Sequence, residues 1–357
     1  MPPLSSSDRI RLAAYGILED FPDGPPCDLL NDIHPLFVRQ RWVGISDQEF
    51  SDIIPALRLA SFFLNIPPAK RFLVKLALAD LITDEEQGRN FLAEIPHITR
   101  EKFLQTDRIL IEAANYLDIS FGIWVNGNTP HGVDTDAETK MDWSLSRPPV
   151  DPPSFATWNS RIRYHYRVKL DFHQQYIDYL REMPIANRRV GERLRFYFLI
   201  AQILIHELAH VLEKLRFETL MITAEEDIDI WYNATDSVPE LGFSFEQAIF
   251  PNMRLTTGGF SHFIPADGLW SSSWSDIAVN PADGELYVKD PTRLYGVPNS
   301  WVNQFFRQDF WHKVETDGWE NVPKPVFKVI SWARTDNTRE FTFQGPPLYN
   351  NVADTVD

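Results

Sequence analysis

The chain has 357 residues, of which 44 % are hydrophobic and 13 % aromatic, and its formal net charge is −16 at pH 7. This length and apolar content predict an ordered globular protein with a substantial core, arranged as one large domain or two. The negative charge argues against nucleic acid or an anionic membrane as a partner.

The cysteine content and the N-terminal segment bear on where the protein resides. Cys27 is the only cysteine, which excludes an intramolecular disulfide and fits a reducing compartment. Asp8, Arg9 and Arg11 interrupt the N-terminal segment, so we expect no signal peptide. No run of eighteen apolar residues occurs, so we expect no membrane span. These features predict a cytoplasmic or nuclear protein.

Residues 1–116 are predicted to form an N-terminal helical region. Ser7 or Asp8 can cap a first helix that ends near residues 21–24, and Ser46 can cap a second. Apolar residues at helical spacing predict further helices at 69–82, 84–95 and 98–117. No catalytic spacing occurs in this region.

The middle of the chain predicts strands on either side of a long loop. Residues 120–125 and the alternating residues 161–170 each suit a strand. The polar, proline-rich residues 126–160 between them predict a loop, which could form a flap over a cleft. The strand at 161–170 could be an edge that pairs with an extended substrate, or it could be an ordinary strand of a sheet. Residues 171–181 predict a helix.

A long helix is predicted from about Gly191 to Phe217. The segment has no proline and no internal glycine, and its apolar residues keep a helical period. Between Phe196 and Ile205 it is apolar nearly all round, which is typical of a helix buried in a core. Polar side chains in such a helix need partners.

This helix carries the pattern HELAH at residues 206–210. His206 and His210 lie one turn apart on the same face, so both rings can reach one zinc ion. Glu207 can hold a zinc-bound water and deprotonate it. The alternatives are a core helix whose histidines and glutamate are satisfied by ordinary hydrogen bonds, and a metal site without catalysis.

A catalytic zinc usually has three protein ligands, so a third ligand is expected. The metzincin pattern HExxHxxGxxH is excluded because Glu213 and Arg216 occupy the positions of its glycine and last histidine. A glutamate on a following helix is the other common choice. Glu240 fits this choice, since Pro239 favours a first helical turn there. Gly242 would allow that second helix to approach the helix of the HELAH pattern closely.

The combination of HELAHVL with ELGFSFE at residues 240–246 resembles the gluzincin metallopeptidases. Aminopeptidases of that clan carry HELAH followed by NEGFA, and a group of uncharacterised fungal HExxH proteins carries HELAH followed by ExGxxxE. The resemblance covers about residues 196–251 and implies a zincin-like fold with Glu240 as the third ligand. No GAMEN-type motif occurs, and Ser244 stands where the ExxxD aspartate would be, so no gluzincin substrate class is assigned.

Glu246 is the rival third ligand. It lies six positions after Glu240, about 240° further round a regular helix, so the two carboxylates cannot both face one metal from that helix. Glu240 is preferred because Gly242 mirrors the gluzincin pattern. The alternative role for Glu246 is to accept a hydrogen bond from a histidine N–H and so orient that ring.

The last third of the chain predicts short strands and one aromatic helix. The strands are expected at 262–264, 286–289 and 326–332, and the helix at 298–314. A hydrolase must also stabilise an oxyanion, for which Tyr232, His262 and Tyr295 are candidates that the sequence does not separate.

Together these patterns predict a mainly helical α+β protein. It would contain an N-terminal helical region (1–116), a zincin-like catalytic region (117–340) with an active-site helix and a small sheet, and a C-terminal tail (341–357). The expected function is zinc-dependent hydrolysis of peptide bonds, with one Zn²⁺ per chain held by His206, His210 and Glu240 and with Glu207 as the base. The expected partner is a peptide or protein substrate. The alternatives are a catalytically inactive zinc-binding interaction protein and a zinc amidohydrolase that acts on a small amide.

Overall fold

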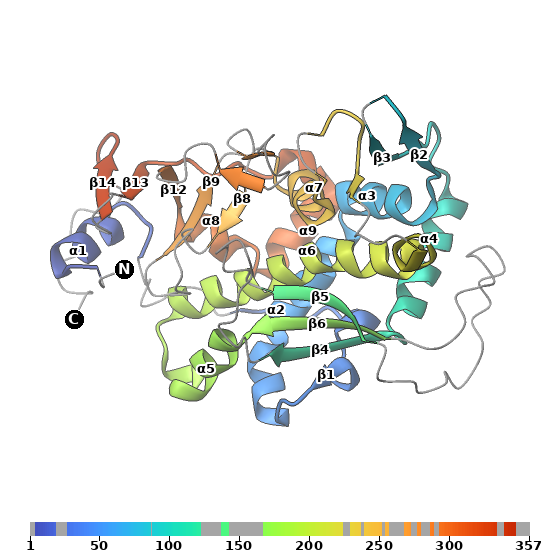
Figure 1. Cartoon of the computed structure of the whole chain (residues 1–357). Coiled ribbons are helices and arrows are strands. Elements are labelled where there is room, and N and C mark those ends of the chain that lie inside the picture. Colours follow the sequence, from blue (N-terminus) through green and yellow to red (C-terminus); the bar gives the residue numbers. More distant parts are fainter. Residues whose placement is uncertain are drawn as a thin grey trace.

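The structure is a computed structural model (Figure 1). It describes residues 4–18, 27–86, 88–122, 137–142, 167–223, 229–236, 239–251, 254–256, 268–272, 277–279, 286–288, 293–333 and 339–347. The chain is an α+β protein in which helix predominates and the sheets are small, and this confirms the coarse prediction of the fold.

The long helix α6 (Val190–Thr223) runs through the middle of the molecule (Figure 1). The prediction that residues 196–205 are buried in the core is confirmed by Phe196, Phe198 and Leu204, which are completely buried. It contacts α2 and a four-stranded sheet of parallel and antiparallel strands. It also contacts α3 and α7, which lie above it in Figure 1. By length and composition alone the stretch Val190–Arg216 could cross a membrane, but 83 % of its apolar window is buried inside the protein, as in a core helix.

A four-stranded sheet lies along one side of α6, in the order β1-β4-β6-β5 (Figure 1). The first three strands are parallel, and β5 runs antiparallel to β6. Ile119, Leu170 and Thr139 are opposite one another across β4, β6 and β5, and all three are buried. The strands are β1 (Trp42–Val43), β4 (Leu117–Gly122), β5 (Ala137–Asp142) and β6 (Arg167–His173).

The position of β5 overturns one prediction and decides between two alternatives. Residues 126–160 were expected to form a loop, but residues 137–142 form a strand. Of the strand expected at 161–170, residues 161–166 lie outside the described residues and 167–170 belong to β6. Because β6 lies between β4 and β5, it is an ordinary interior strand and not the substrate-pairing edge. Among the described residues β5 pairs only with β6, so it is the edge strand beside α6.

Most of the predicted helices of the N-terminal region are present. Ser46 caps α2 in a full capping box with Glu49, as its position predicts. The first helix differs, because it begins after Ser5 and ends at Ala14. The helices are α1 (Ser6–Ala14), α2 (Asp47–Asn65), α3 (Pro67–Leu78), α4 (Arg100–Ala113) and α5 (Gln174–Glu182). Single 3₁₀ turns occupy Pro35–Phe37, Arg39–Arg41, Ile185–Asn187 and Trp319–Asn321.

The prediction of a helix at 84–95 is wrong. These residues belong to a hairpin of β2 (Leu81–Asp84) and β3 (Arg89–Leu92), and β3 also pairs in parallel with β7 (Ile230–Trp231). Gly88 adopts a φ of 63°, a turn conformation that glycine adopts readily and that interrupts a helix. The pairing with β7 joins residues that are far apart in the sequence, which local periodicity does not reveal.

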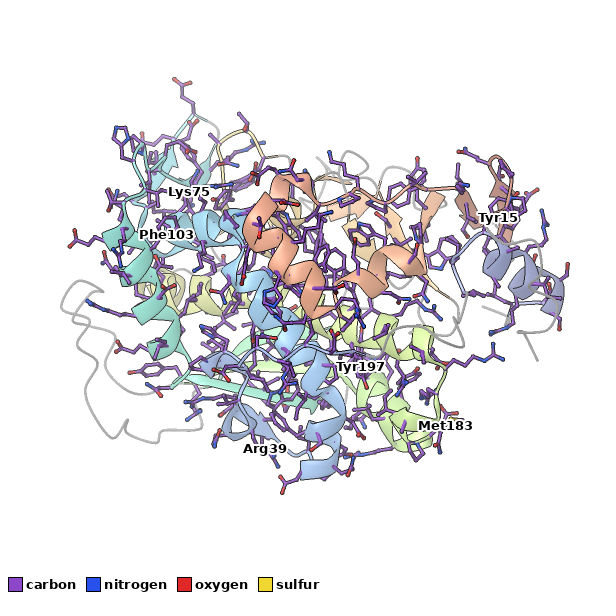
Figure 2. All side chains as sticks on the ribbon, turned by 180° about the vertical axis from the view of Figure 1, so that it is seen from behind. Tyr15, Arg39, Lys75, Phe103, Met183 and Tyr197 are labelled. Carbon is purple, nitrogen blue, oxygen red and sulfur yellow. The ribbon has the colours of Figure 1, made fainter. Side chains whose placement is uncertain are left out.

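A five-stranded sheet is drawn above α6 in Figure 1, on the side away from the four-stranded sheet, and residues of α1 pack against it. Tyr15, labelled in Figure 2, donates a hydrogen bond to the carbonyl of Gly345. The side chain of Ile17 occupies space that two glycines leave open. A Cβ on Gly268 would lie 2.8 Å from Ile17, and a Cβ on Gly296 would lie 2.9 Å from it. The strands are β8 (Arg254–Thr256), β9 (Leu269–Ser272), β12 (Arg293–Val297), β13 (Val329–Ala333) and β14 (Arg339–Phe343), and β10 (Ile277–Val279) pairs separately with β11 (Leu286–Val288).

The aromatic segment 298–314 forms two helices, α8 (Asn299–Gln304) and α9 (Gln308–Asp317), instead of the single helix predicted. Phe305, at the break between them, is completely buried among the rings of Phe63, Trp301 and Trp319. The strands predicted at 286–289 and 326–332 are observed as β11 and β13, whereas 262–264 lies outside the described residues.

The hydrophobic core crosses the predicted boundary at residue 116. One buried cluster extends from Leu29 on the N-terminal side to Trp319 near the C-terminus. The predicted tail starts at residue 341, inside β14, and residues 348–357 lie outside the described residues. The division of the chain at residues 116 and 340 therefore remains a prediction.

Candidate metal centre

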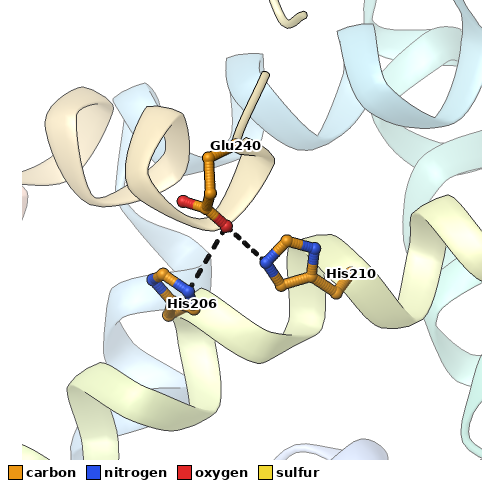
Figure 3. A group of neighbouring side chains, drawn as sticks. All are labelled: His206, His210 and Glu240. Atoms are coloured by element: carbon orange, nitrogen blue, oxygen red, sulfur yellow. Dashed lines mark ion pairs between the residues drawn. The ribbon is translucent and has the colours of Figure 1, made fainter. Parts of the chain in front are cut away.

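The two histidines of the HELAH pattern lie on the face of α6 that meets α7 (Leu241–Ile249). Their rings converge on the carboxylate of Glu240 (Figure 3). Glu240 Oε1 is 2.5 Å from His210 Nε2 and 3.5 Å from His206 Nε2. One nitrogen from each histidine and one oxygen from Glu240 therefore lie within 4.8 Å of one another.

Glu240 reaches this position as the N-cap of α7, not from inside the helix as the sequence suggested. Its carboxylate accepts hydrogen bonds from the backbone N–H groups of Gly242 and Phe243. A carboxylate at a helix N-terminus is stabilised both by these donors and by the helix dipole. The cap thus fixes the direction in which Glu240 points.

The other ring nitrogen of each histidine is paired with a different carboxylate. His206 Nδ1 is 2.7 Å from Glu246 Oε1, and His210 Nδ1 is 3.1 Å from Glu213 Oε2. Glu246 is thus on the far side of the His206 ring from Glu240. It is placed for its alternative role, which is to accept a hydrogen bond from the ring N–H of a histidine. A carboxylate that accepts the Nδ1 proton fixes the tautomer that leaves Nε2 for a metal, and it raises the basicity of the ring.

The donor set suits a zinc ion, and one of the two separations from Glu240 suits it as well. Two imidazole nitrogens and one carboxylate oxygen are a common ligand set for catalytic zinc. Ligand atoms about 2.0–2.1 Å from a tetrahedral ion are roughly 3.3 Å apart. The separation of His206 Nε2 and Glu240 Oε1, 3.5 Å, is close to this value. The separation of His210 Nε2 and Glu240 Oε1, 2.5 Å, is shorter and is that of a charged hydrogen bond.

The two histidines and Glu240 are coupled electrostatically. Burial lowers the pKa of His206, but the charges of Glu240 and Glu246 outweigh it and raise the pKa to about 9. The pKa of His210 is raised well above its ordinary value against the same burial, by Glu240 and Glu213. Burial raises the pKa of Glu240, but the two histidines lower it to about 2. A cation that binds both Nε2 atoms must displace their protons, so its binding strengthens as the pH rises toward 9.

Gly242 allows α6 and α7 to approach each other closely, as its position predicts. A Cβ at residue 242 would lie 2.5 Å from both Cδ2 and Nε2 of His206. Such a distance is well inside van der Waals contact, so any larger residue has to move this ring.

Gly242→Ala is therefore expected to displace the His206 ring and weaken metal binding, while the rest of the fold is kept. Isothermal titration with Zn²⁺ measures the affinity. Gly122→Ala is the matched control, because its Cβ would meet Asp171 at 3.4 Å, which is ordinary contact. Unchanged affinity in Gly242→Ala would contradict the close approach of α7 to His206.

Glu207, the predicted base, is 5 % exposed and faces the sheet. Its Oε2 accepts a hydrogen bond of 2.6 Å from the hydroxyl of Thr139 on β5. Its charge helps to raise the pKa of both histidines, so it lies within electrostatic range of the ligand group. His206, His210 and Glu240 are thus brought together, whereas Glu207 lies on the side of α6 that meets the sheet and acts on both histidines only through its charge. Thr139 was missed, since it lies 68 positions away in a segment predicted to be a loop.

The segment that leads to Glu240 is held by Lys75 of α3, which sequence reasoning also missed (Figure 2). The ammonium of Lys75 donates to Glu94 and to Asn233, and it lies 4.7 Å from the ring centroid of Tyr232. Asn233 in turn donates to Asp236 through its backbone and its side chain. This network fixes the backbone a few residues before the cap of α7.

Glu240 and Glu246 are expected to differ in their effect on metal affinity. Glu246→Ala removes only the acceptor at His206 Nδ1, and such changes typically cost about 10–100-fold in affinity. Glu240→Ser keeps a hydroxyl that can cap α7 but removes the carboxylate ligand, so its loss is expected to be larger. Competition titration with a zinc chelator ranks the two variants. The reverse order would assign the ligand to Glu246.

The candidate oxyanion stabilisers remain unassigned. The ring of Tyr232 stacks on Phe72 with centroids 4.2 Å apart, and burial raises the pKa of its hydroxyl. Tyr295 is on β12 of the five-stranded sheet, and its ring contacts the ring of Phe327. His262 lies outside the described residues.

Comparison of the chain with protein-family models, with curated proteins and with solved structures finds no match.

Proposed function

We propose that this chain is a zinc-dependent metallopeptidase of gluzincin type, with a zincin-like core. The observation that carries the proposal is the convergence of His206 Nε2, His210 Nε2 and Glu240 Oε1, with a carboxylate on Nδ1 of each ring. Ordinary hydrogen bonding would satisfy two half-buried histidines with fewer acidic groups. Three carboxylates around two imidazole rings carry a negative charge that a bound divalent cation would neutralise.

The chain's own residues would divide the chemistry as follows. His206, His210 and Glu240 would hold the ion. When bound, Zn²⁺ supplies a Lewis acid that polarises the scissile carbonyl and increases the acidity of water. Glu207 would take a proton from the attacking water and return it to the leaving amine. Its burial keeps competing solvent away from the carboxylate.

The outer edge of β5, which no described strand covers, favours a peptide over a small amide as substrate. Among the described residues β5 has no partner on its outer edge, and it lies directly beside the helix that carries the histidines. An extended peptide could add to this edge through main-chain hydrogen bonds, which read the backbone more than the side chains. A small amide would make no use of such an edge.

An inactive zinc-binding interaction protein is the second candidate. It is disfavoured by Glu207, because a structural site needs no buried carboxylate next to its ligands. The net charge of −16 supports the further proposal that neither nucleic acid nor an anionic membrane is a partner.

The proposal is tested by digesting a broad peptide library with the zinc-loaded protein. We expect cleavage that stops when a chelator removes the ion and returns when Zn²⁺ is restored. Zinc at about one per chain with no cleavage of any peptide would instead support the interaction protein. Absence of stoichiometric zinc binding would overturn both readings.

A further inference from the structure

Glu207 has a neighbour that the metal centre does not require. The hydroxyl of Thr139 donates to Glu207 Oε2 at 2.6 Å, and both residues are buried. Thr139 is on β5, and its side chain lies on the sheet face shared with Leu170, which is directly opposite in the register. The contact therefore joins the edge strand to the predicted base.

This contact distinguishes the two oxygens of the carboxylate. A hydroxyl that donates to Oε2 occupies that oxygen with a hydrogen bond, so Oε1 is the oxygen left to face another donor. It also restrains rotation of a side chain that has several rotatable bonds. The proton from water would then go to Oε1, and the carboxylate would be oriented before a substrate binds.

We propose that Thr139 is a positioning residue for Glu207, so that β5 both binds the substrate backbone and orients the base. This inference rests on the proposed function. A peptide that added to the outer edge of β5, where no described strand pairs, would restrain the strand that carries Thr139. Substrate binding and orientation of the base are then coupled through one hydroxyl.

Thr139→Val tests this inference because valine keeps the shape and β-branching of threonine and removes only the hydroxyl. We expect kcat to fall by about 10–100-fold, the typical value of a hydrogen bond to a charged group, with little change in KM. Zinc affinity should stay within about threefold of the parent, since the hydroxyl of Thr139 donates to Glu207 and not to a proposed ligand. Thr139→Ser keeps the donor and should restore most of the rate.

A second readout does not need a substrate. A simple hydroxamate binds zinc and can give its proton to a neighbouring carboxylate, so its affinity for the zinc-loaded protein reports on the position of Glu207. Thr139→Val should weaken hydroxamate binding in the parent but not in a Glu207→Gln background, where the charged acceptor is already absent. A double-mutant cycle over the four proteins measures this coupling.

The outcomes separate the two proposals. If the parent binds zinc and hydroxamate and Thr139→Val changes neither kcat nor hydroxamate affinity, Thr139 has no positioning role and the metallopeptidase proposal stands. If Thr139→Ser fails to restore what Thr139→Val loses, the effect comes from packing, which also overturns the inference. If the parent binds no zinc, the failure lies in the proposed function itself.

Discussion

Glu207→Gln is expected to keep the zinc and the fold while peptide hydrolysis falls by about 10²–10⁴-fold, the usual contribution of a general base. The side chain is nearly isosteric, and its amide oxygen can still accept the hydrogen bond from Thr139. The helix and both histidines should therefore stay in place. What is lost is the acceptor for the proton of the attacking water.

Steady-state kinetics on a cleaved library peptide measure this loss. Zinc content near one per chain and a melting temperature within a degree or two of the parent would show that only the chemistry changed. Hydrolysis at the parental rate would show that Glu207 is not the base.

The variant His206→Ala/His210→Ala is expected to lose stoichiometric zinc. It removes two of the three ligand atoms, and Glu240 alone is left at the N-terminus of α7. Zinc content after purification without chelator, measured by elemental analysis, should fall from about one per chain to background. His312→Ala is the control, since His312 also pairs with a glutamate three residues later on a helix but lies exposed, far along the chain from the site.

Removing both rings also leaves Glu246 without its histidine partner at 2 % exposure, and an uncompensated buried charge typically destabilises a protein by about 3–5 kcal/mol. His210→Gln alone avoids this, because the pair of His206 and Glu246 is kept. Circular dichroism checks the fold of both variants. Full zinc retention in a folded double variant would remove the basis of the metal centre.

The sequence predicts those parts of the site that depend on local spacing. The helix α6 follows from an apolar pattern without internal proline or glycine, and the positions of His206, Glu207 and His210 follow from the helical repeat. Glu213 was also within reach of this reasoning, since a residue three positions after His210 lies on the same face. Gly242 was identified correctly, because a glycine beside a proposed ligand indicates a close approach of two backbones.

The parts that depend on long-range pairing were not predictable in this way. Residues 84–95 have helical periodicity but are drawn into a hairpin that pairs with β7, more than 130 positions further along the chain. β5 lies in a polar, proline-rich segment, and its strand conformation depends on hydrogen bonds to β6. Glu240 was expected in the first turn of α7 and is its cap, since Leu241 is the first helical residue.

The most direct test of the metal centre is anomalous diffraction from a crystal of the zinc-loaded protein, recorded on both sides of the zinc absorption edge. The arrangement of the three side chains predicts one strong anomalous peak per chain, bonded to Nε2 of His206, Nε2 of His210 and a carboxylate oxygen of Glu240. Glu246 and Glu213 should remain on the Nδ1 atoms. A peak bonded to other residues, or no peak in a crystal grown with equimolar zinc, would contradict the assignment of these three residues as a metal site.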